Sequence, residues 1–209
     1  MTDRTLLLRA LARVVAAAPA APVTERLCRG TVGLLGAGGA VLTCAPAGPS
    51  RFAAFATDDV AARLDEIEEL VGDGPGLRAF RSGRSVGTVL GDPDDAAEDL
   101  PVFAVLAGEV ADGAVAVRSW PVRSGGSAVA VLTVHGLPLG GPQDEGRGRP
   151  SGPGETVQDG QVLADALAPV VVGAGGLDLL DRRVHRAVGM VVAQTGLAPE
   201  DATALLRAR

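Results

Sequence analysis

Residues 71–86 read VGDGPGLRAFRSGRSV, and their interpretation determines what is expected on either side. Glycine and proline at this density are compatible with a phosphate-binding loop or with a turn between two elements. A Walker A loop needs a lysine that reaches the phosphates, and the chain contains no lysine. Gly74, Gly76 and Ala79 fit the looser GxGxxA pattern, but that pattern must directly follow a parallel strand, and residues 58–70 predict a helix. The sequence therefore favours a turn.

The apolar pattern around this turn alternates between helices and short strands. Apolar residues recur at helical spacing, and we expect helices over residues 3–18, 23–35, 58–70 and 158–172, with a shorter one around 103–110. Short apolar runs between turn formers predict strands over residues 38–44, 50–57, 85–90, 114–122 and 127–135. The last two strands alternate apolar with small or polar residues around the tripeptide SGG, which indicates an antiparallel hairpin. We therefore expect an α+β fold built on an antiparallel sheet.

Two glycine-rich segments divide the chain. Residues 136–157 are rich in glycine and proline, and we expect a flexible insertion there. The run GAGG at residues 173–176 separates a body, residues 1–173, from a tail, residues 177–209. Two helices are predicted in the tail, because a glycine ends the first helical pattern and a proline with two acids begins the second.

The composition argues against several kinds of site. A net charge of −6 and an aromatic content of 2% argue against a chain-wide surface for nucleic acid. Two cysteines and two histidines are too few for a zinc site, and neither His135 nor His185 has the partners of a catalytic triad. The carboxylates of residues 65–69 are expected on an exposed helix face. No uncharged apolar stretch reaches about 18 residues. We therefore expect a cytoplasmic protein without metal, cofactor or catalytic activity.

The tail differs from the rest of the chain in charge and in pattern. Residues 177–209 hold five arginines and four acids, a net of +1, whereas residues 1–176 hold 14 and 21, a net of −7. The densest positive cluster of the chain is Arg182, Arg183, His185 and Arg186. Contacts with RNA phosphates, an interhelical salt bridge and a solvated helix face are all compatible with this cluster. Alternating spacings of three and four form an apolar seam that predicts a homodimer: Leu177, Leu180, Val184, Ala187, Val191 and Gln194.

The tail resembles the ANTAR domain of bacterial antitermination regulators. In the segment RRVHRAVGMVVAQTGLAPEDATALLRAR, the matching positions are Ala187, Gly189, Met190, Gly196, Ala202, Leu205, Leu206 and Arg207. The resemblance implies that the tail binds hairpin loops of a nascent RNA and promotes antitermination of transcription. The residues that would contact the RNA are Arg182, Arg183, His185 and Arg186.

The body is similar to the GAF domains that precede ANTAR domains. GDGPGLRAFRSGRSV matches their glycine–proline turn and short helix, and the hairpin WPV…GG…AVAVLTV fits the same template. The resemblance implies a central antiparallel sheet with the helices of residues 3–35 and 158–172 packed on one face. It also implies a pocket for a signal molecule on the other face, near Phe80, Phe103 and Trp120, without identifying that molecule.

Two functions are compatible with these resemblances. In the first, the GAF body senses a signal and the tail binds structured RNA. In the second, the chain is a sensor whose tail serves dimerisation or partner docking without binding RNA. Val188 stands where the ANTAR family usually has a lysine, and the match covers two of the family's three helices, which favours the second function.

Overall fold

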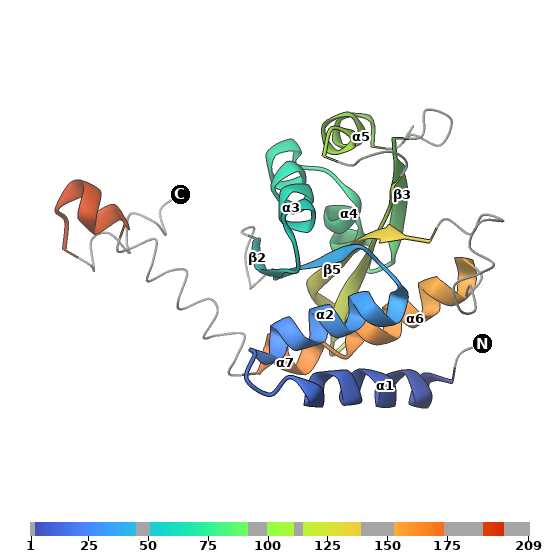
Figure 1. Cartoon of the computed structure of the whole chain (residues 1–209). Coiled ribbons are helices and arrows are strands. Elements are labelled where there is room, and N and C mark those ends of the chain that lie inside the picture. The colour runs from blue at the N-terminus through green and yellow to red at the C-terminus, as the bar shows by residue number, and fades with distance from the viewer. Residues whose placement is uncertain are drawn as a thin grey trace. The chain divides into compact units, whose positions relative to one another are not determined.

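The computed structural model describes residues 3–44, 51–91, 100–110, 115–138, 153–173 and 190–198. The chain divides into two units, Met1–Pro169 and Val170–Arg209. The first unit combines a five-stranded sheet with helices, which is the α+β class expected from the sequence (Figure 1).

The sheet is antiparallel, with the strand order β2-β1-β5-β4-β3. Its strands are β1 (Gly39–Cys44), β2 (Phe52–Ala56), β3 (Val86–Leu90), β4 (Val115–Ser124) and β5 (Ser127–Leu137). The predicted hairpin is confirmed: β4 pairs with β5, and the chain turns at Gly125 and Gly126, whose φ angles are 58° and 86°. Such positive φ angles favour glycine, which accounts for the GG pair in the turn.

Helices cover both faces of the sheet (Figure 1). On one side, α2 (Val23–Leu35) and α6 (Pro153–Asp165) cover the sheet and α1 (Arg4–Ala17) packs against these two helices, so that the three pack together as the GAF resemblance implied. The opposite face carries three others: α3 (Asp59–Val71), α4 (Pro75–Ser82) and α5 (Pro101–Gly108). The short helix α7 (Ala168–Val172) follows α6 in the chain. The face expected to hold a ligand is therefore the one under α3, α4 and α5.

The segment expected to be a flexible insertion is partly regular at both ends. Strand β5 continues to Leu137, and α6 begins at Pro153, five residues before the helix predicted from the apolar pattern. Proline is well tolerated in the first turn of a helix, because its missing N–H has no partner there in any case. Residues 139–152 lie outside the described residues.

The core between the sheet and the α1, α2 and α6 layer contains Trp120 of β4. Trp120 is fully buried, and its indole Nε1–H donates a hydrogen bond of 2.9 Å to the Val157 carbonyl of α6. Helix α6 approaches the ring very closely, because a Cβ at Gly160 would lie 2.2 Å from Trp120 Cζ2. A glycine at position 160 therefore allows α6 to pack against the indole.

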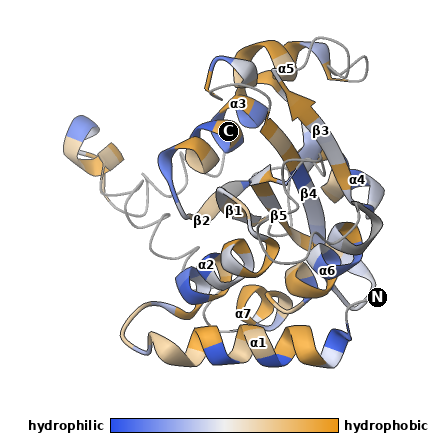
Figure 2. Cartoon of the chain, turned by 45° about the vertical axis from the view of Figure 1, so that its right-hand side comes forward, coloured by the Kyte–Doolittle hydropathy of each residue, from blue (hydrophilic) through white to orange (hydrophobic). Residues whose placement is uncertain are grey.

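A separate apolar cluster fills the space between α3, α5 and the sheet. Phe103 of α5 is buried in it together with Leu64, Ile67, Leu90, Leu100, Ala107 and Val117. Helix α5 contains no charged residue, and Figure 2 shows its apolar character. Because Val117 and Trp120 of β4 point to opposite faces, each side of the sheet has its own core.

The segment 71–86 forms the predicted turn between two helices. Gly72 ends α3 with a φ of 72°, and its N–H donates to the Glu68 carbonyl at 2.9 Å. Pro75 is the first residue of α4, and Gly83, with a φ of 67°, ends it. Left-handed glycines at helix ends and proline at a helix start are the usual signals for these positions.

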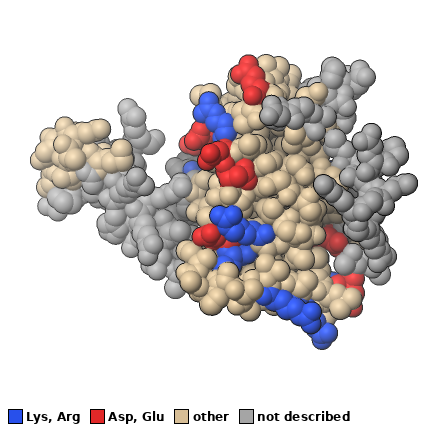
Figure 3. Space-filling model, viewed as in Figure 1, with Lys and Arg blue, Asp and Glu red and all other residues tan. Residues whose placement is uncertain are grey.

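The face of the molecule seen in Figure 3 is mixed in charge. Figure 3 shows arginine side chains interleaved with Asp and Glu side chains on the face in view, and this pattern does not form one basic surface. Among the described residues, no helix combines the length and the hydropathy needed to traverse a lipid bilayer.

The close contact between α6 and Trp120 predicts that substitution of Gly160 strongly lowers the stability of the protein. Replacing Gly160 with Ala should lower the free energy of unfolding by about 1–3 kcal/mol, because the new methyl group overlaps the indole. Gly33 of α2 is the matched control, since a Cβ there meets nothing within 4 Å. Gly33→Ala should raise the stability by up to about 1 kcal/mol through helix propensity. Urea unfolding of both variants measures the two effects, and equal effects would contradict this packing.

Candidate functional site

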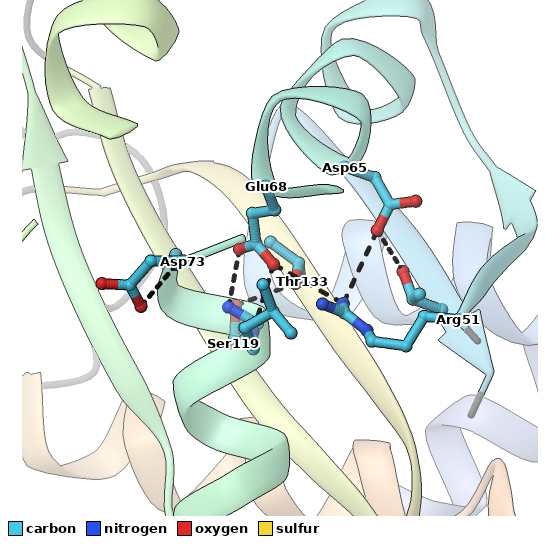
Figure 4. Close-up of polar contacts among 10 residues, drawn as sticks. Arg51, Asp65, Glu68, Asp73, Ser119 and Thr133 are labelled. Carbon is cyan, nitrogen blue, oxygen red and sulfur yellow. Dashed lines mark hydrogen bonds and ion pairs between the residues drawn. The ribbon is translucent and has the colours of Figure 1, made fainter. Parts of the chain in front are cut away.

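Buried polar side chains gather on the sheet face under α3 and α4. Of the six buried polar or charged residues in the described part of the chain, four lie here: Thr43, Glu68, Ser119 and Thr133 (Figure 4). Burying polar groups costs free energy unless each finds a partner. A concentration of them in one place therefore marks this face as the candidate functional site.

Glu68 is the central group of this site. Its carboxylate accepts hydrogen bonds from the backbone N–H groups of Gly76, at 2.6 Å, and Leu77, at 3.1 Å, in the first turn of α4. Burial raises the pKa of Glu68, while the Gly76 N–H and the nearby Arg51 act in the opposite direction. The helix N-terminus therefore holds an anion, and that anion belongs to the chain itself.

The glycines of the 71–86 segment make room for this carboxylate. A Cβ at Gly74 would lie 2.4 Å from Glu68 Cγ, and a Cβ at Gly76 would lie 2.6 Å from Glu68 Oε2 and 3.1 Å from Thr133 Oγ1. The sequence explained Gly74 by turn geometry alone. The structure adds a second requirement, which is the close approach of a side chain from α3.

Arg51, at the start of the β2 side of the hairpin, lies beside two carboxylates (Figure 4). Its Nη2 atom is 3.5 Å from Glu68 Oε2 and 3.8 Å from Asp65 Oδ1. These are ion-pair distances, and within the described part of the chain the buried Nε and Nη2 atoms have no hydrogen-bond partner. Since guanidinium N–H groups are strong donors, Arg51 can still bind an acceptor.

The remaining polar groups of the site are hydroxyls and one further carboxylate. The Thr43 hydroxyl donates to Asp65 Oδ1 at 2.5 Å, and the Ser119 and Thr133 hydroxyls are 2.8 Å apart. Together the site offers guanidinium donors, carboxylate acceptors and hydroxyls, which suits recognition of a polar molecule.

A second polar group lies at the N-terminus of α3. Asp58 accepts hydrogen bonds from the Ala61 N–H and the Thr57 hydroxyl, and it lies 2.9 Å from His135 Nε2. Burial alone would raise the pKa of Asp58, but these three hydrogen bonds outweigh it and hold the pKa below its ordinary value. A Cβ at Gly39 would overlap the Asp58 carboxylate. This group fastens α3 to β1 and β5, and its acceptors are already in use.

A metal-ligand group and a reactive thiol are two further kinds of site that the described residues could provide. Within them, no group of three or more His, Cys, Asp or Glu side chains could hold a metal ion. Burial, with a contribution from Cys44, raises the pKa of Cys28 to about 12, so this thiol stays protonated and is a poor nucleophile.

The structure does not bring the three expected pocket residues together. Phe103 belongs to the apolar cluster under α5, and Phe80 is partly buried on α4. Trp120 points to the opposite face of the sheet, where it packs on α6. Of the expected tail residues, Met190 is 57% exposed and Gly196 has a φ of 69°. The others lie outside the described residues: Arg182, Arg183, His185, Arg186, Ala187, Gly189, Ala202, Leu205, Leu206 and Arg207.

Sequence reasoning missed the residues of the polar site. The carboxylates of residues 65–69 were expected on an exposed face, and for Glu68 this is wrong, whereas Glu66 and Glu69 are exposed. One signal was present: Glu68 falls four residues after Leu64, on the same helix stripe as the buried Ala61. A carboxylate on an apolar stripe indicates a buried partner.

Comparisons with known proteins find solved structures that are similar to this chain at low sequence identity. No family model matches the chain, and no curated protein matches it. Among solved structures, the chain is similar to the A. aeolicus nlh2 GAF domain in an inactive state, with 12% identity, a TM-score of 0.47, and coverage of 87% of this chain and 99% of that one. It is also similar to the chromophore-binding domain of Stigmatella aurantiaca bacteriophytochrome, with 11% identity, a TM-score of 0.37, and coverage of 82% and 62%.

The raised pKa of Glu68 predicts a pH dependence of stability. An acid whose pKa is higher in the folded state than its ordinary value of 4.5 contributes stability below pH 4.5, and this is lost as the pH rises through the folded pKa. Glu68→Gln removes this titration. The variant should therefore gain stability relative to the wild type as the pH rises from about 4.5 toward neutrality. Urea unfolding at a series of pH values measures the difference, with exposed Glu69→Gln as control. A constant difference would contradict the burial of an ionisable Glu68.

Proposed function

We propose that the Met1–Pro169 unit is a GAF-type sensory domain that binds a small molecule beside Arg51, on the sheet face under α3 and α4, and that it acts without catalysis. The observation that carries this proposal is the pair of buried Arg51 nitrogens, Nε and Nη2, that lack hydrogen-bond partners in the described residues. Leaving a buried charged donor unsatisfied costs more than an ordinary hydrogen bond gains. A bound ligand that accepts from Arg51 removes this cost.

The expectation from the sequence supports this location for the ligand. The GAF resemblance implied a pocket on the face away from α1, α2 and α6, and Arg51 lies on that face with Asp65 and Glu68. Trp120, which was expected to line the pocket, is replaced in this role by these polar residues. The ligand is therefore recognised mainly by hydrogen bonds, with the apolar cluster of Phe103 nearby in the same helix layer.

The same contacts connect the ligand site to α4. Glu68 is bonded to the first turn of α4 and lies 3.5 Å from Arg51 Nη2. A ligand that draws the guanidinium away weakens one attraction on the Glu68 carboxylate and thereby changes the anchoring of α4. Binding is in this way coupled to a shift of a helix, as sensing requires.

The proposed ligand site is tested by a thermal-shift screen of small metabolites with a matched pair of variants. A true ligand at about 100 times its Kd should stabilise the protein by about 2.7 kcal/mol. Arg51→Gln should abolish this shift, because the variant lacks the guanidinium. Arg63→Gln should retain it, since Arg63 is exposed and pairs with Glu66 on the outer side of α3. Ligands whose shift survives in Arg51→Gln would place the binding site elsewhere.

For the tail we propose RNA binding that promotes transcription antitermination, in the cytoplasm where transcripts form. The support comes from the sequence: the ANTAR resemblance, the net charge of +1, and the cluster of Arg182, Arg183, His185 and Arg186. The alternative is a sensor whose tail mediates dimerisation or partner docking through the apolar seam of residues 177–194. Val188, at the usual lysine position, favours this alternative.

Filter binding to stem-loop RNA across a salt series distinguishes these two roles of the tail. If the arginines bind phosphates, Arg182→Ala with Arg183→Ala should reduce the slope of log K against log salt by about 1.5, because each phosphate that is no longer neutralised lowers the slope by roughly 0.7–0.9. Arg63→Ala, on the exposed side of α3, is the control and should leave the slope unchanged. Absence of retention at low salt would favour the docking role.

A further inference from the structure

The charges around Arg51 restrict the kind of molecule that can bind there. We propose that the ligand is an uncharged compound that presents a carbonyl oxygen beside an N–H group, as a lactam does. This inference rests on the proposed function, since it names the ligand class of the same site. Its basis is the placement of Arg51 and Asp65, which lie side by side at the more exposed end of the polar cluster.

The donor half of the site is the Nε–Nη2 edge of Arg51. Both atoms are buried and lack hydrogen-bond partners in the part of the chain that the structure describes. Their N–H groups point in nearly the same direction in a planar guanidinium, so one carbonyl oxygen can accept from both. This edge therefore selects an acceptor group on the ligand.

The acceptor half of the site is the Asp65 carboxylate. Among the described residues, the Thr43 hydroxyl is its one hydrogen-bond donor, at Oδ1, which leaves most of its lone pairs unused. Glu68 is less suitable, because both of its oxygens already accept backbone N–H groups. Asp65 therefore selects a donor on the ligand, adjacent to the acceptor that Arg51 selects.

The exposed fractions indicate from which side a ligand reaches these groups. The side chains of Arg51 and Asp65 retain 14% and 13% exposure, whereas that of Glu68 retains 3%. Solvent thus reaches parts of the Arg51 and Asp65 side chains more than that of Glu68, although Nε and Nη2 of Arg51 are themselves buried. A ligand that approaches from this side reaches Arg51 and Asp65 before Glu68, and it must displace the atoms that cover the Arg51 nitrogens.

The balance of charge argues for an uncharged ligand. Nη2 of Arg51 lies within 4 Å of two carboxylates, so an anionic ligand would be repelled by Asp65 and by ionised Glu68. A cationic ligand would be repelled by Arg51, but Asp65 and ionised Glu68 would attract it. Burial raises the pKa of Glu68, and once Glu68 takes up a proton the charges of Arg51 and Asp65 cancel. In that protonation state, hydrogen bonding to a neutral amide carries the least electrostatic cost.

Four small probes of similar size separate the ligand classes. They are 2-piperidone, which has the carbonyl and the N–H; N-methyl-2-piperidone, which lacks the N–H; pentanoate, an anion; and piperidine, a cation at neutral pH. Binding to the full-length protein is measured by titration calorimetry or ligand-observed NMR. We expect 2-piperidone to bind at least about tenfold more tightly than its N-methyl analogue, because the analogue cannot donate a hydrogen bond to the Asp65 carboxylate. Pentanoate and piperidine should bind more weakly still.

Two variants assign that binding to the two halves of the site. Arg51→Gln should abolish binding of 2-piperidone, whereas Arg63→Gln on the outer side of α3 should not change it. Asp65→Asn should weaken the binding of 2-piperidone and leave the binding of N-methyl-2-piperidone nearly unchanged, because only 2-piperidone has an N–H that donates to the Asp65 carboxylate. Circular dichroism verifies that the Asn variant is folded, and the Arg51 variant gives an independent readout.

The outcomes separate this inference from the proposed function. Tighter binding of pentanoate that is lost in Arg51→Gln would overturn the uncharged ligand class while leaving a ligand site at Arg51. Equal binding of 2-piperidone and its N-methyl analogue would overturn the donor–acceptor pairing. Absence of binding by all four probes would overturn the inference, and the metabolite screen with Arg51→Gln would then decide on the site itself.

Discussion

The buried carboxylate of Glu68 constrains much of the face on which it lies. Taking an ionisable group out of water is costly, and here the cost is offset by two backbone N–H groups of α4 and by the nearby Arg51. These partners can approach only because positions 74 and 76 carry no side chain. The contacts of Glu68 thus position the first turn of α4 relative to α3, require glycine at positions 74 and 76, and place Arg51 beside the carboxylate.

The two faces of the sheet differ in the polarity of the residues packed on them. Under α1, α2 and α6 the packing is mainly apolar, and the indole N–H of Trp120 is satisfied by the Val157 carbonyl, although the buried Thr31 hydroxyl of α2 has no hydrogen-bond partner among the described residues. Under α3 and α4 the packing includes threonine, serine, glutamate and arginine, some of whose donors remain unused. A fold gains stability from the first kind of packing and loses it with the second. The larger number of buried polar groups under α3 and α4 is what the proposed binding site would account for.

The sequence predicted the framework well where the signal is local. Alternation around a GG turn identified β4 and β5, and glycine and proline identified the ends of α3 and α4. The sequence-based predictions for Trp120 and Glu68 were wrong, because the orientation of these side chains depends on which helices cover each face of the sheet. When helices cover both faces, apolar residues occur on both sides of a strand, and alternation no longer tells which way a ring points. A charged side chain such as that of Glu68 is normally expected to be exposed, unless a partner distant in the sequence, here Arg51, is known.

In the proposed sensor, recognition and response would use the same cluster of residues. Arg51 belongs to the chain segment between β1 and β2, Asp65 and Glu68 belong to α3, and the groups that Glu68 holds belong to α4. A molecule that accepts from Arg51 competes with the attraction between Arg51 and Glu68, which is stronger in a buried site than in water. Any change in that attraction acts on the first turn of α4 through hydrogen bonds of 2.6 and 3.1 Å. Because packed interiors transmit strain rather than absorb it, we expect a ligand bound at the proposed site to act most directly on the first turn of α4.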